Sequence, residues 1–321
     1  MTARSMLRAL LLVQGVCAIL VGYALARALD AGFITGLAGG TLALVLVRLA
    51  ISANNFRISA RTSSFTPHEH RIGAAGALRL FGEEFVASMR FSSWIMPRAV
   101  PGMQVYSEAT RWPVLLVHGY GCNSGNWAYL TPLLDAARIS YATIDLAPVT
   151  ASMDRFSPLV EEGVRALLAA TGAARVVIVA HSMGGLVARA WMRDAGVDRV
   201  ASVITMGTPH QGTAMATIGI GKNALQMRRD SAWLRALAAS ESAATRALIT
   251  SIYTHHDNIV TPQTSSELDG ARNLGFGGVG HVALAANPRI LAAVMRALES
   301  GATGEVGRLV NAGRQVKAAH R

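Results

Sequence analysis

The fold of this chain is indicated by one stretch, which reads Arg175-Val176-Val177-Ile178-Val179-Ala180-His181-Ser182-Met183-Gly184-Gly185. Its first part is apolar and β-branched, which predicts a short buried strand, and the residues after Gly185 have the composition of a helix. Small residues stand two positions either side of Ser182, as a very tight strand-to-helix turn requires. The pattern predicts a nucleophile elbow, which presents the serine hydroxyl at the tip of a sheet and at a helix N-terminus.

Strand and helix signals alternate after Arg111, which predicts a mostly parallel sheet covered by helices on both faces. We expect strands at 114–118, 141–146, 176–180, 200–206, 249–254 and 273–276. The best-supported helices are 124–137, 157–170, 183–194 and 288–298, each with apolar residues three and four apart. Ligands of such sheets bind beyond the carboxyl ends of the strands, where every candidate catalytic residue falls.

A serine nucleophile needs a base, and the base needs a carboxylate to orient it, in the chain order Ser, Asp, His. His281 ends the glycine-rich turn Gly277-Gly278-Val279-Gly280-His281 after the last predicted strand, which suits a base. Asp257 follows the strand 249–254 and is expected to bind the far nitrogen of His281. Asp145, at the end of another strand, is the alternative acid.

A second glycine turn, His118-Gly119-Tyr120-Gly121, follows the strand 114–118. Such a turn frees backbone N–H groups, which can stabilise the oxyanion of a tetrahedral intermediate. We expect the amides of Tyr120 and Met183 to form this oxyanion hole.

The remaining histidines receive no catalytic role. His181 is expected to point into the strand packing, and His255 and His256 are interpreted as loop or pocket-rim residues. The segment His68-Glu69-His70 alternates metal-binding side chains, but no third ligand is near in sequence, so no metal and no cofactor are predicted.

These motifs resemble those of bacterial lipases and esterases of the α/β-hydrolase superfamily, over roughly residues 112–298. The resemblance rests on the elbow, whose initial alanine is similar to that of a subgroup of these lipases, on the His118 turn, on Gly207-Thr208-Pro209-His210-Gln211-Gly212-Thr213, and on the Asp257 and His281 segments. It implies that the segment 207–213 borders the active site, with His210 in a structural or pocket role. It also implies that the apolar stretch 214–240 caps the pocket and favours acyl chains. The alternative is a pair of amphipathic helices that cover the sheet.

The N-terminus contains two long uncharged runs, 9–26 and 31–47, in a chain of 321 residues that is 51% hydrophobic and only 15% charged. The first run reaches about 27 Å as a helix, close to the thickness of a hydrocarbon core, and the second can extend past Arg48. Gly36 and Gly40, four apart, would let the two helices approach closely. We therefore expect a transmembrane helical hairpin over residues 1–52.

Arginines precede and follow this hairpin, so the positive-inside rule places both its ends in the cytoplasm of an inner-membrane protein. The alternative is a cleaved signal peptide, with Arg4 and Arg8 before the apolar run and Ala24-Leu25-Ala26 as the cleavage site, which would make the protein secreted or periplasmic. The two cysteines, Cys17 and Cys122, predict no disulfide.

Residues 53–111 are expected to form a linker in which Ile72, Leu78, Phe81, Phe85, Met89 and Trp94 recur at near-helical intervals. Such a helix suits the membrane surface, and the alternative is a helix packed on the catalytic domain, residues 112–300. The net charge of +11 suits an anionic membrane, and no basic block with interleaved aromatic residues predicts nucleic acid binding. A basic tail, 301–321, completes the chain.

The sequence thus predicts a membrane-anchored serine hydrolase, a lipase or esterase, that cleaves acyl esters or lipids. Thioester hydrolysis and acyl transfer use the same residues and stay open. A catalytically silent membrane-tethered scaffold is the alternative from another class of protein. A dehalogenase or epoxide hydrolase is disfavoured, because those reactions need a carboxylate at the elbow.

Overall fold

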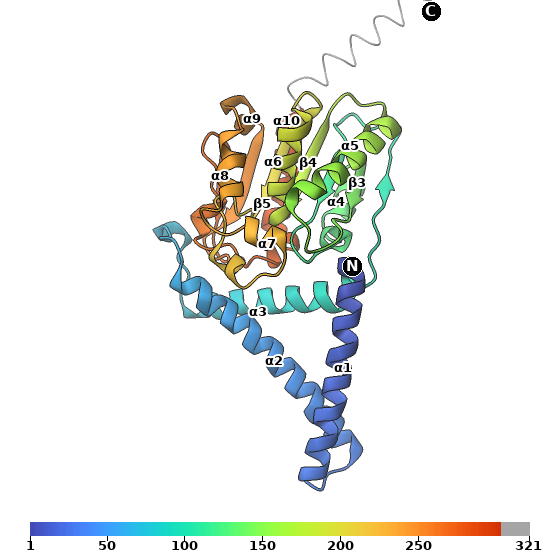
Figure 1. Cartoon of the computed structure of the whole chain (residues 1–321), viewed down its shortest axis with the longest axis vertical. Helices are drawn as coiled ribbons and strands as arrows, with labels where there is room; N and C mark the ends of the chain where they lie inside the picture. Colours follow the sequence, from blue (N-terminus) through green and yellow to red (C-terminus); the bar gives the residue numbers. More distant parts are fainter. Residues whose placement is uncertain (303–321) are drawn as a thin grey trace, which may run out of the picture.

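The computed structural model describes residues 1–302, with side chains as far as Glu299. The predicted tail begins at residue 301, and its basic residues Arg308, Arg314, Lys317 and Arg321 lie outside the described residues. Figure 1 shows a sheet flanked by helices, below which three N-terminal helices form a triangle. We call residues 103–302 the sheet domain.

The predicted mostly parallel sheet is confirmed. Its strands lie in the order β1-β3-β2-β4-β5-β6-β7, and all neighbours are parallel except β1 and β3. The strands are β1 (Met103–Gln104), β2 (Val114–Val117), β3 (Tyr141–Ile144), β4 (Val176–His181), β5 (Val200–Met206), β6 (Ile249–Thr254) and β7 (Arg272–Phe276). The antiparallel edge strand β1 was not predicted, because it is only two residues long and exposed.

The central strands β2 and β4 are buried along their whole length, which explains why they appear in the sequence as continuous apolar runs. Alternate side chains of β2 enter two hydrophobic cores, Leu115 and Val117 on one face and Val114 and Leu116 on the other. The sheet is therefore covered on both faces.

The helices of the sheet domain are α4 (Thr131–Ala136), α5 (Ser157–Thr171), α6 (Met183–Ala195), α7 (Lys222–Gln226), α8 (Ala232–Ala239), α9 (Ala243–Ala247) and α10 (Pro288–Ala302). Residues of α5, α6 and α8 belong to the core on one face, and residues of α4 and α10 to the core on the other. The helix expected at 124–137 is divided into the 3₁₀ turn η3 (Ser124–Trp127) and α4. Pro132 lies in the first turn of α4, where its fixed φ and missing N–H are tolerated.

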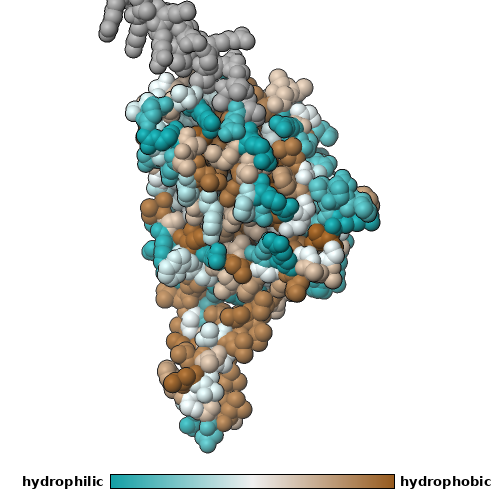
Figure 2. Space-filling view, turned by 180° about the vertical axis from the view of Figure 1, so that it is seen from behind, coloured by the Kyte–Doolittle hydropathy of each residue, from teal (hydrophilic) through white to brown (hydrophobic). Residues whose placement is uncertain are grey.

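Two N-terminal helices, α1 (Ala3–Ala28) and α2 (Phe33–Arg61), form the predicted hairpin and are long and apolar enough to cross a membrane. They approach closely, since a methyl group at Gly40 would be 1.9 Å from the Ala18 carbonyl oxygen. Figure 2 shows hydrophobic surface gathered on this tapering part. The second helix does not end near residue 52, the expected boundary, but continues to Arg61.

Both ends of the hairpin return to the sheet domain. Near the start of α1, Leu7 is buried in one of its cores, and near the end of α2, Ser59 is buried. Helix α3 (Ala74–Arg90) lies across the base of the sheet domain between these ends (Figure 1). Leu80, Glu84 and Ala87 form its buried side. Helix α3 therefore packs on the sheet domain.

The other side of α3 carries apolar residues of the predicted pattern. Phe81 packs on Phe56 of α2, with ring centroids 5.8 Å apart, and Leu78 is 74% exposed. Trp94, in the π-helical turn η2 (Phe91–Ile95), is 65% exposed. The apolar residues of the predicted pattern thus lie mainly on the side of α3 that faces away from the sheet domain.

Candidate active site

Ser182 lies in a strained turn between β4 and α6. Its φ of 54° and ψ of −127° fall in a region that non-glycine residues rarely adopt, and such strain is concentrated at functional sites. Its N–H donates to the Met206 carbonyl of β5 at 2.8 Å. A Cβ at Gly184 would be 2.3 Å from the Val117 carbonyl oxygen, so a glycine is required where α6 passes the end of β2. The turn fixes the serine at the carboxyl edge of the sheet.

Three of the predicted site residues come together through hydrogen bonds. The Nε2 atom of His281 lies 3.0 Å from the Ser182 hydroxyl, and its Nδ1 lies 2.8 Å from Oδ2 of Asp257. All three side chains are buried. They come from the loops after β4, β6 and β7, which end at the same edge of the sheet.

The Asp257 carboxylate is fixed by further donors. Its Oδ1 accepts the N–H groups of Ile259 and Val260 at 2.8 and 2.7 Å, so Oδ2 is directed at the imidazole. The Asp257 carbonyl accepts the Ser59 hydroxyl of α2 at 2.9 Å. Gln263 donates to the same carbonyl, also at 2.9 Å.

The surroundings of His281 favour its protonated form. Burial lowers the pKa of His281, but the charge of Asp257, its hydrogen bond and the charge of Glu84 together raise that pKa above its usual value. A group with this environment can accept a proton from a neighbouring hydroxyl and is stabilised as a cation.

Two neighbouring histidines are structural. The His181 ring lies 4.9 Å from the His281 ring, and burial lowers the pKa of His181 to about 3, so it is neutral. The Nε2 atom of His118 accepts the Leu146 N–H at 2.9 Å, and burial also lowers its pKa. Asp145 accepts the Ser124 N–H at 2.7 Å and lies 4.0 Å from His118, and it makes no contact with His281.

The predicted oxyanion donors lie beside the elbow. Met183 begins α6, directly after Ser182, and Tyr120 follows β2. Within residues 1–302 neither backbone N–H has a protein acceptor, so both are free for a ligand. A Cβ on Gly119 would be 2.8 Å from Cβ of Ser182, so the Tyr120 turn and the elbow are in contact.

The segment 214–240 divides into two parts. The first part, with η5 (Ala214–Thr217) and α7, crosses to the loop after β2, where the Tyr120 hydroxyl donates to the Ile220 carbonyl at 2.7 Å and accepts its N–H at 3.0 Å. Ile218 and Ile220 are exposed there. The second part, α8, packs on α6 through buried leucines. The first part borders the site, and the second covers the sheet.

His210, His255 and His256 lie outside the hydrogen-bonded chain. The His210 ring is bound between Arg189 and Thr205, and burial lowers its pKa well below the usual value. His70 stacks on His255 with ring centroids 4.7 Å apart, and His256 accepts the Gly278 N–H. Among the described residues, no group of three or more His, Cys, Asp or Glu side chains is arranged to hold a metal ion.

Sequence reasoning missed the two N-terminal residues that contact the site, Ser59 and Glu84. The Glu84 carboxylate binds the N–H groups of Val282 and Ala283, next to His281. One sequence signal was available, because Leu80, Glu84, Ala87 and Phe91 have helical spacing and three of the four are apolar.

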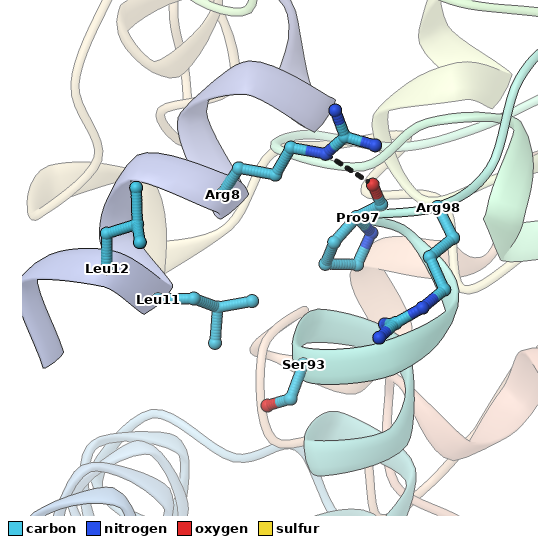
Figure 3. Close-up of a pocket in the computed structure, with 6 residues that line it drawn as sticks. All are labelled: Arg8, Leu11, Leu12, Ser93, Pro97 and Arg98. Atoms are coloured by element: carbon cyan, nitrogen blue, oxygen red, sulfur yellow. Dashed lines mark hydrogen bonds between the residues drawn. The ribbon is translucent and has the colours of Figure 1, made fainter. Parts of the chain in front are cut away.

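A cavity of about 480 Å³ lies elsewhere, between α1 and η2 (Figure 3). Arg8 donates to the Pro97 carbonyl at 2.8 Å at its edge, and Leu11, Leu12, Ser93 and Arg98 complete its lining. None of the hydrogen-bonded residues around Ser182 lines it.

Comparison with known proteins agrees with this architecture. Residues 113–247 match the family described as alpha/beta hydrolase fold. The chain is 32% identical over 119 residues to a triacylglycerol lipase of Pseudarthrobacter phenanthrenivorans, and this alignment covers 34% of this chain and 36% of that protein. It is 34% identical over 119 residues to a triacylglycerol lipase of Vibrio cholerae, and this alignment covers 36% of this chain and 38% of that protein. The chain thus spans about a third of the length of these curated relatives.

Solved structures share the fold at low identity. The mature Bacillus licheniformis lipase BlEst2 aligns with a TM-score of 0.55 and 17% identity, over 62% of this chain and 97% of that one. The Aspergillus fumigatus lipase B aligns with a TM-score of 0.54 and 18% identity, over 64% of this chain and 58% of that one.

The sheet order, the serine at its strained turn and the family match show that this chain has an α/β-hydrolase fold. Over about a third of its length, its sequence is similar to those bacterial triacylglycerol lipases.

Proposed function

We propose that the protein is a membrane-anchored serine ester hydrolase in which Ser182, His281 and Asp257 form a catalytic triad. The observation that carries this proposal is the continuous hydrogen-bonded chain from Asp257 through His281 to Ser182, with the serine at a nucleophile elbow. The sequence similarity to triacylglycerol lipases supports the reaction class.

In the proposed reaction, His281 Nε2 takes the Ser182 proton as Oγ attacks the carbonyl carbon of an acyl ester. The Tyr120 and Met183 amides hold the oxyanion, and the N-terminus of α6 adds a favourable dipole. His281 then gives the proton to the leaving alcohol, which leaves an acyl-serine. Water, deprotonated by His281, attacks this ester, and the imidazolium returns the proton to Ser182 Oγ as the acyl–Oγ bond breaks and the carboxylic acid is released. Asp257 stabilises the imidazolium in both steps.

The proposed anchor is the α1–α2 hairpin, in an inner membrane, with both ends and the sheet domain in the cytoplasm. Two helices of sufficient length and hydropathy support this, as do the arginines on both sides of the hairpin. The signal-peptide alternative fits the contacts of α1 less well. The Met1 carbonyl accepts the Val149 N–H, Leu7 is buried in the core and Arg8 binds Pro97. Cleavage after Ala26 would remove all three contacts.

The proposed substrate is an acyl ester that resides in the bilayer. Because Ser59 of α2 and Glu84 of α3 contact the loops of Asp257 and His281, the carboxyl edge of the sheet lies on the side of the hairpin. A lipid from the same bilayer therefore approaches on the side where Ser182 lies.

The test of the reaction is Ser182→Ala in the purified full chain. We expect it to lose hydrolysis of soluble acyl esters by several orders of magnitude and to lose labelling by a fluorophosphonate probe. Tyr23→Phe, a change in the hairpin far from the elbow, serves as the control. Near-native turnover of the Ser182 variant would contradict the mechanism, and an unlabelled unaltered chain would favour the silent scaffold. Transfer of the acyl group to an added alcohol in place of water would identify an acyltransferase.

The test of the anchor is extraction of membranes. We expect the chain to stay in the membrane fraction through high salt and alkaline carbonate, since two spans bury far more apolar area than a surface helix. A reporter fused after Arg61 should behave as cytoplasmic. A mature chain that begins at Arg27 would instead establish a cleaved signal.

A further inference from the structure

The carboxylate of Glu84 is buried in an unusual place. Glu84 lies midway along α3 and is only 2% exposed. Its Oε1 accepts the Val282 N–H at 3.0 Å, and its Oε2 accepts the Ala283 N–H at 2.8 Å. These are the first two residues after His281, so one carboxylate from the N-terminal helices fixes the backbone from which the imidazole projects.

We propose that Glu84 is a positioning residue for His281, an inference that rests on the proposed hydrolase function. It acts in two ways. Its two acceptor atoms hold the loop after β7 in the position that brings Nε2 to Ser182, and its negative charge stabilises the imidazolium that forms during the reaction.

The packing around Glu84 leaves little freedom for this loop. A Cβ on Gly280, the residue before His281, would be 2.5 Å from Oε2 of Glu84. On either side of Glu84, the apolar residues Leu80 and Ala87 seal the contact between α3 and the sheet domain. The loop and the carboxylate are therefore fitted to each other, and a shift of α3 would move the imidazole.

In the part of the chain that the structure describes, no lysine or arginine forms an ion pair with Glu84. An uncompensated buried carboxylate is costly, and burial raises the pKa of Glu84, although the two N–H donors and His281 lower it. Stabilisation of the His281 imidazolium by this charge would offset the cost of its burial.

Three titratable groups face His281. Asp257 binds Nδ1 from the loop after β6, Glu84 approaches from α3, and the His181 ring lies beside it at the end of β4. The two carboxylates raise the pKa of His281, whereas His181 is neutral. Removal of the Glu84 charge should therefore lower the pKa of His281.

The experiment compares Glu84→Gln with Glu83→Gln in the full chain, in detergent, with a soluble short-chain ester. Glu83 is the preceding residue of the same helix, is partly exposed and pairs with Arg79 at 2.7 Å, so it is a matched control. Glutamine at 84 offers one acceptor and one donor where two acceptors are needed. We expect kcat to fall on the order of 10- to 100-fold, with KM within about twofold, and the acidic limb of the kcat/KM profile to move to lower pH.

A second variant separates the two roles. Glu84→Asp keeps the charge but is too short to reach both N–H groups, so its kcat should fall while its acidic limb stays closer to that of the unaltered chain. Each pH profile is scaled to its own maximum, so the result does not depend on the fraction of protein that folds.

The outcomes distinguish the inference from the function on which it rests. If the unaltered chain has no Ser182-dependent hydrolysis, the proposed function is wrong and the inference fails with it. If the unaltered chain hydrolyses esters and Glu84→Gln has the kcat and acidic limb of Glu83→Gln, the inference alone is overturned.

Discussion

Replacing Asp257 by asparagine tests the triad most directly, because the structure fixes which way the new amide must point. Oδ1 of Asp257 accepts two backbone N–H groups, from Ile259 and Val260. Only the carbonyl oxygen of asparagine can satisfy them, so its NH₂ group must face Nδ1 of His281. The imidazole must then accept at Nδ1 and carry its proton on Nε2, which faces Ser182 and is no longer a base.

The expected magnitude follows from this change of tautomer. In a comparable triad the acid-to-amide change lowers kcat about 10⁴-fold, which corresponds to a transition state about 5.5 kcal/mol less stable. The loss should appear in kcat for a short-chain ester, with the thermal unfolding temperature nearly unchanged, because the backbone hydrogen bonds are kept.

Asp145→Asn is the matched control, since Asp145 also accepts a backbone N–H at a strand end but makes no contact with His281. Its kcat should stay within about tenfold of the unaltered chain, against the about 10⁴-fold loss at Asp257. Equal or greater damage at Asp145 would refute the assignment of Asp257 as the acid.

Three further predictions follow from the site and the anchor. The kcat/KM of the unaltered chain should rise with pH through a pKa above about 6.5, because His281 has a raised pKa and is a base only when neutral; a midpoint well below that value would contradict the environment described. Gly184→Ala should lower the free energy of unfolding by at least about 1–3 kcal/mol, since its methyl group would meet a backbone carbonyl. Gly82→Ala, in open space on α3, should leave it unchanged or raise it by about 0.5–1 kcal/mol; equal thermal unfolding shifts would count against the close contact. Removing residues 1–52 should yield a protein that no longer sediments with membranes and still hydrolyses esters. Removing residues 1–95 should abolish activity, because Ser59 and Glu84 are lost. Full activity of the variant that lacks residues 1–95 would argue against any role for α3.

Much of the sheet domain could be predicted from sequence because burial leaves a strong pattern there. Strands β2 and β4 are buried on both faces and appear as uninterrupted apolar runs, and β5 and β6 lie at their expected positions. The elbow could be placed to the residue, since few residue types fit the strained conformation of Ser182 and the close contact of Gly184. The catalytic roles of these residues stay predictions.

The contacts between the N-terminal helices and the site could not be predicted by the same reasoning. A glutamate on an amphipathic helix usually faces water, so Glu84 had the appearance of a surface residue between apolar neighbours. Its acceptors bind backbone N–H groups nearly two hundred residues later, and backbone donors carry no sequence signature. The Ser59 contact could not be predicted either, because α2 continues past the end of its apolar run, on which the predicted helix was based.

The attachment of the hairpin at both ends also limits how this protein can evolve or be engineered. A tether joined through one flexible linker can be exchanged as a cassette, because its sequence is independent of the domain that it carries. Here the start of α1 is buried in a core of the sheet domain, the end of α2 binds the Asp257 carbonyl, and α3 holds the loop of His281. A foreign transmembrane segment joined at residue 112 would supply none of these contacts. The end of α2, helix α3 and the enzyme should therefore be inherited together and change together, and a transplant of the function into another membrane protein has to begin no later than residue 53.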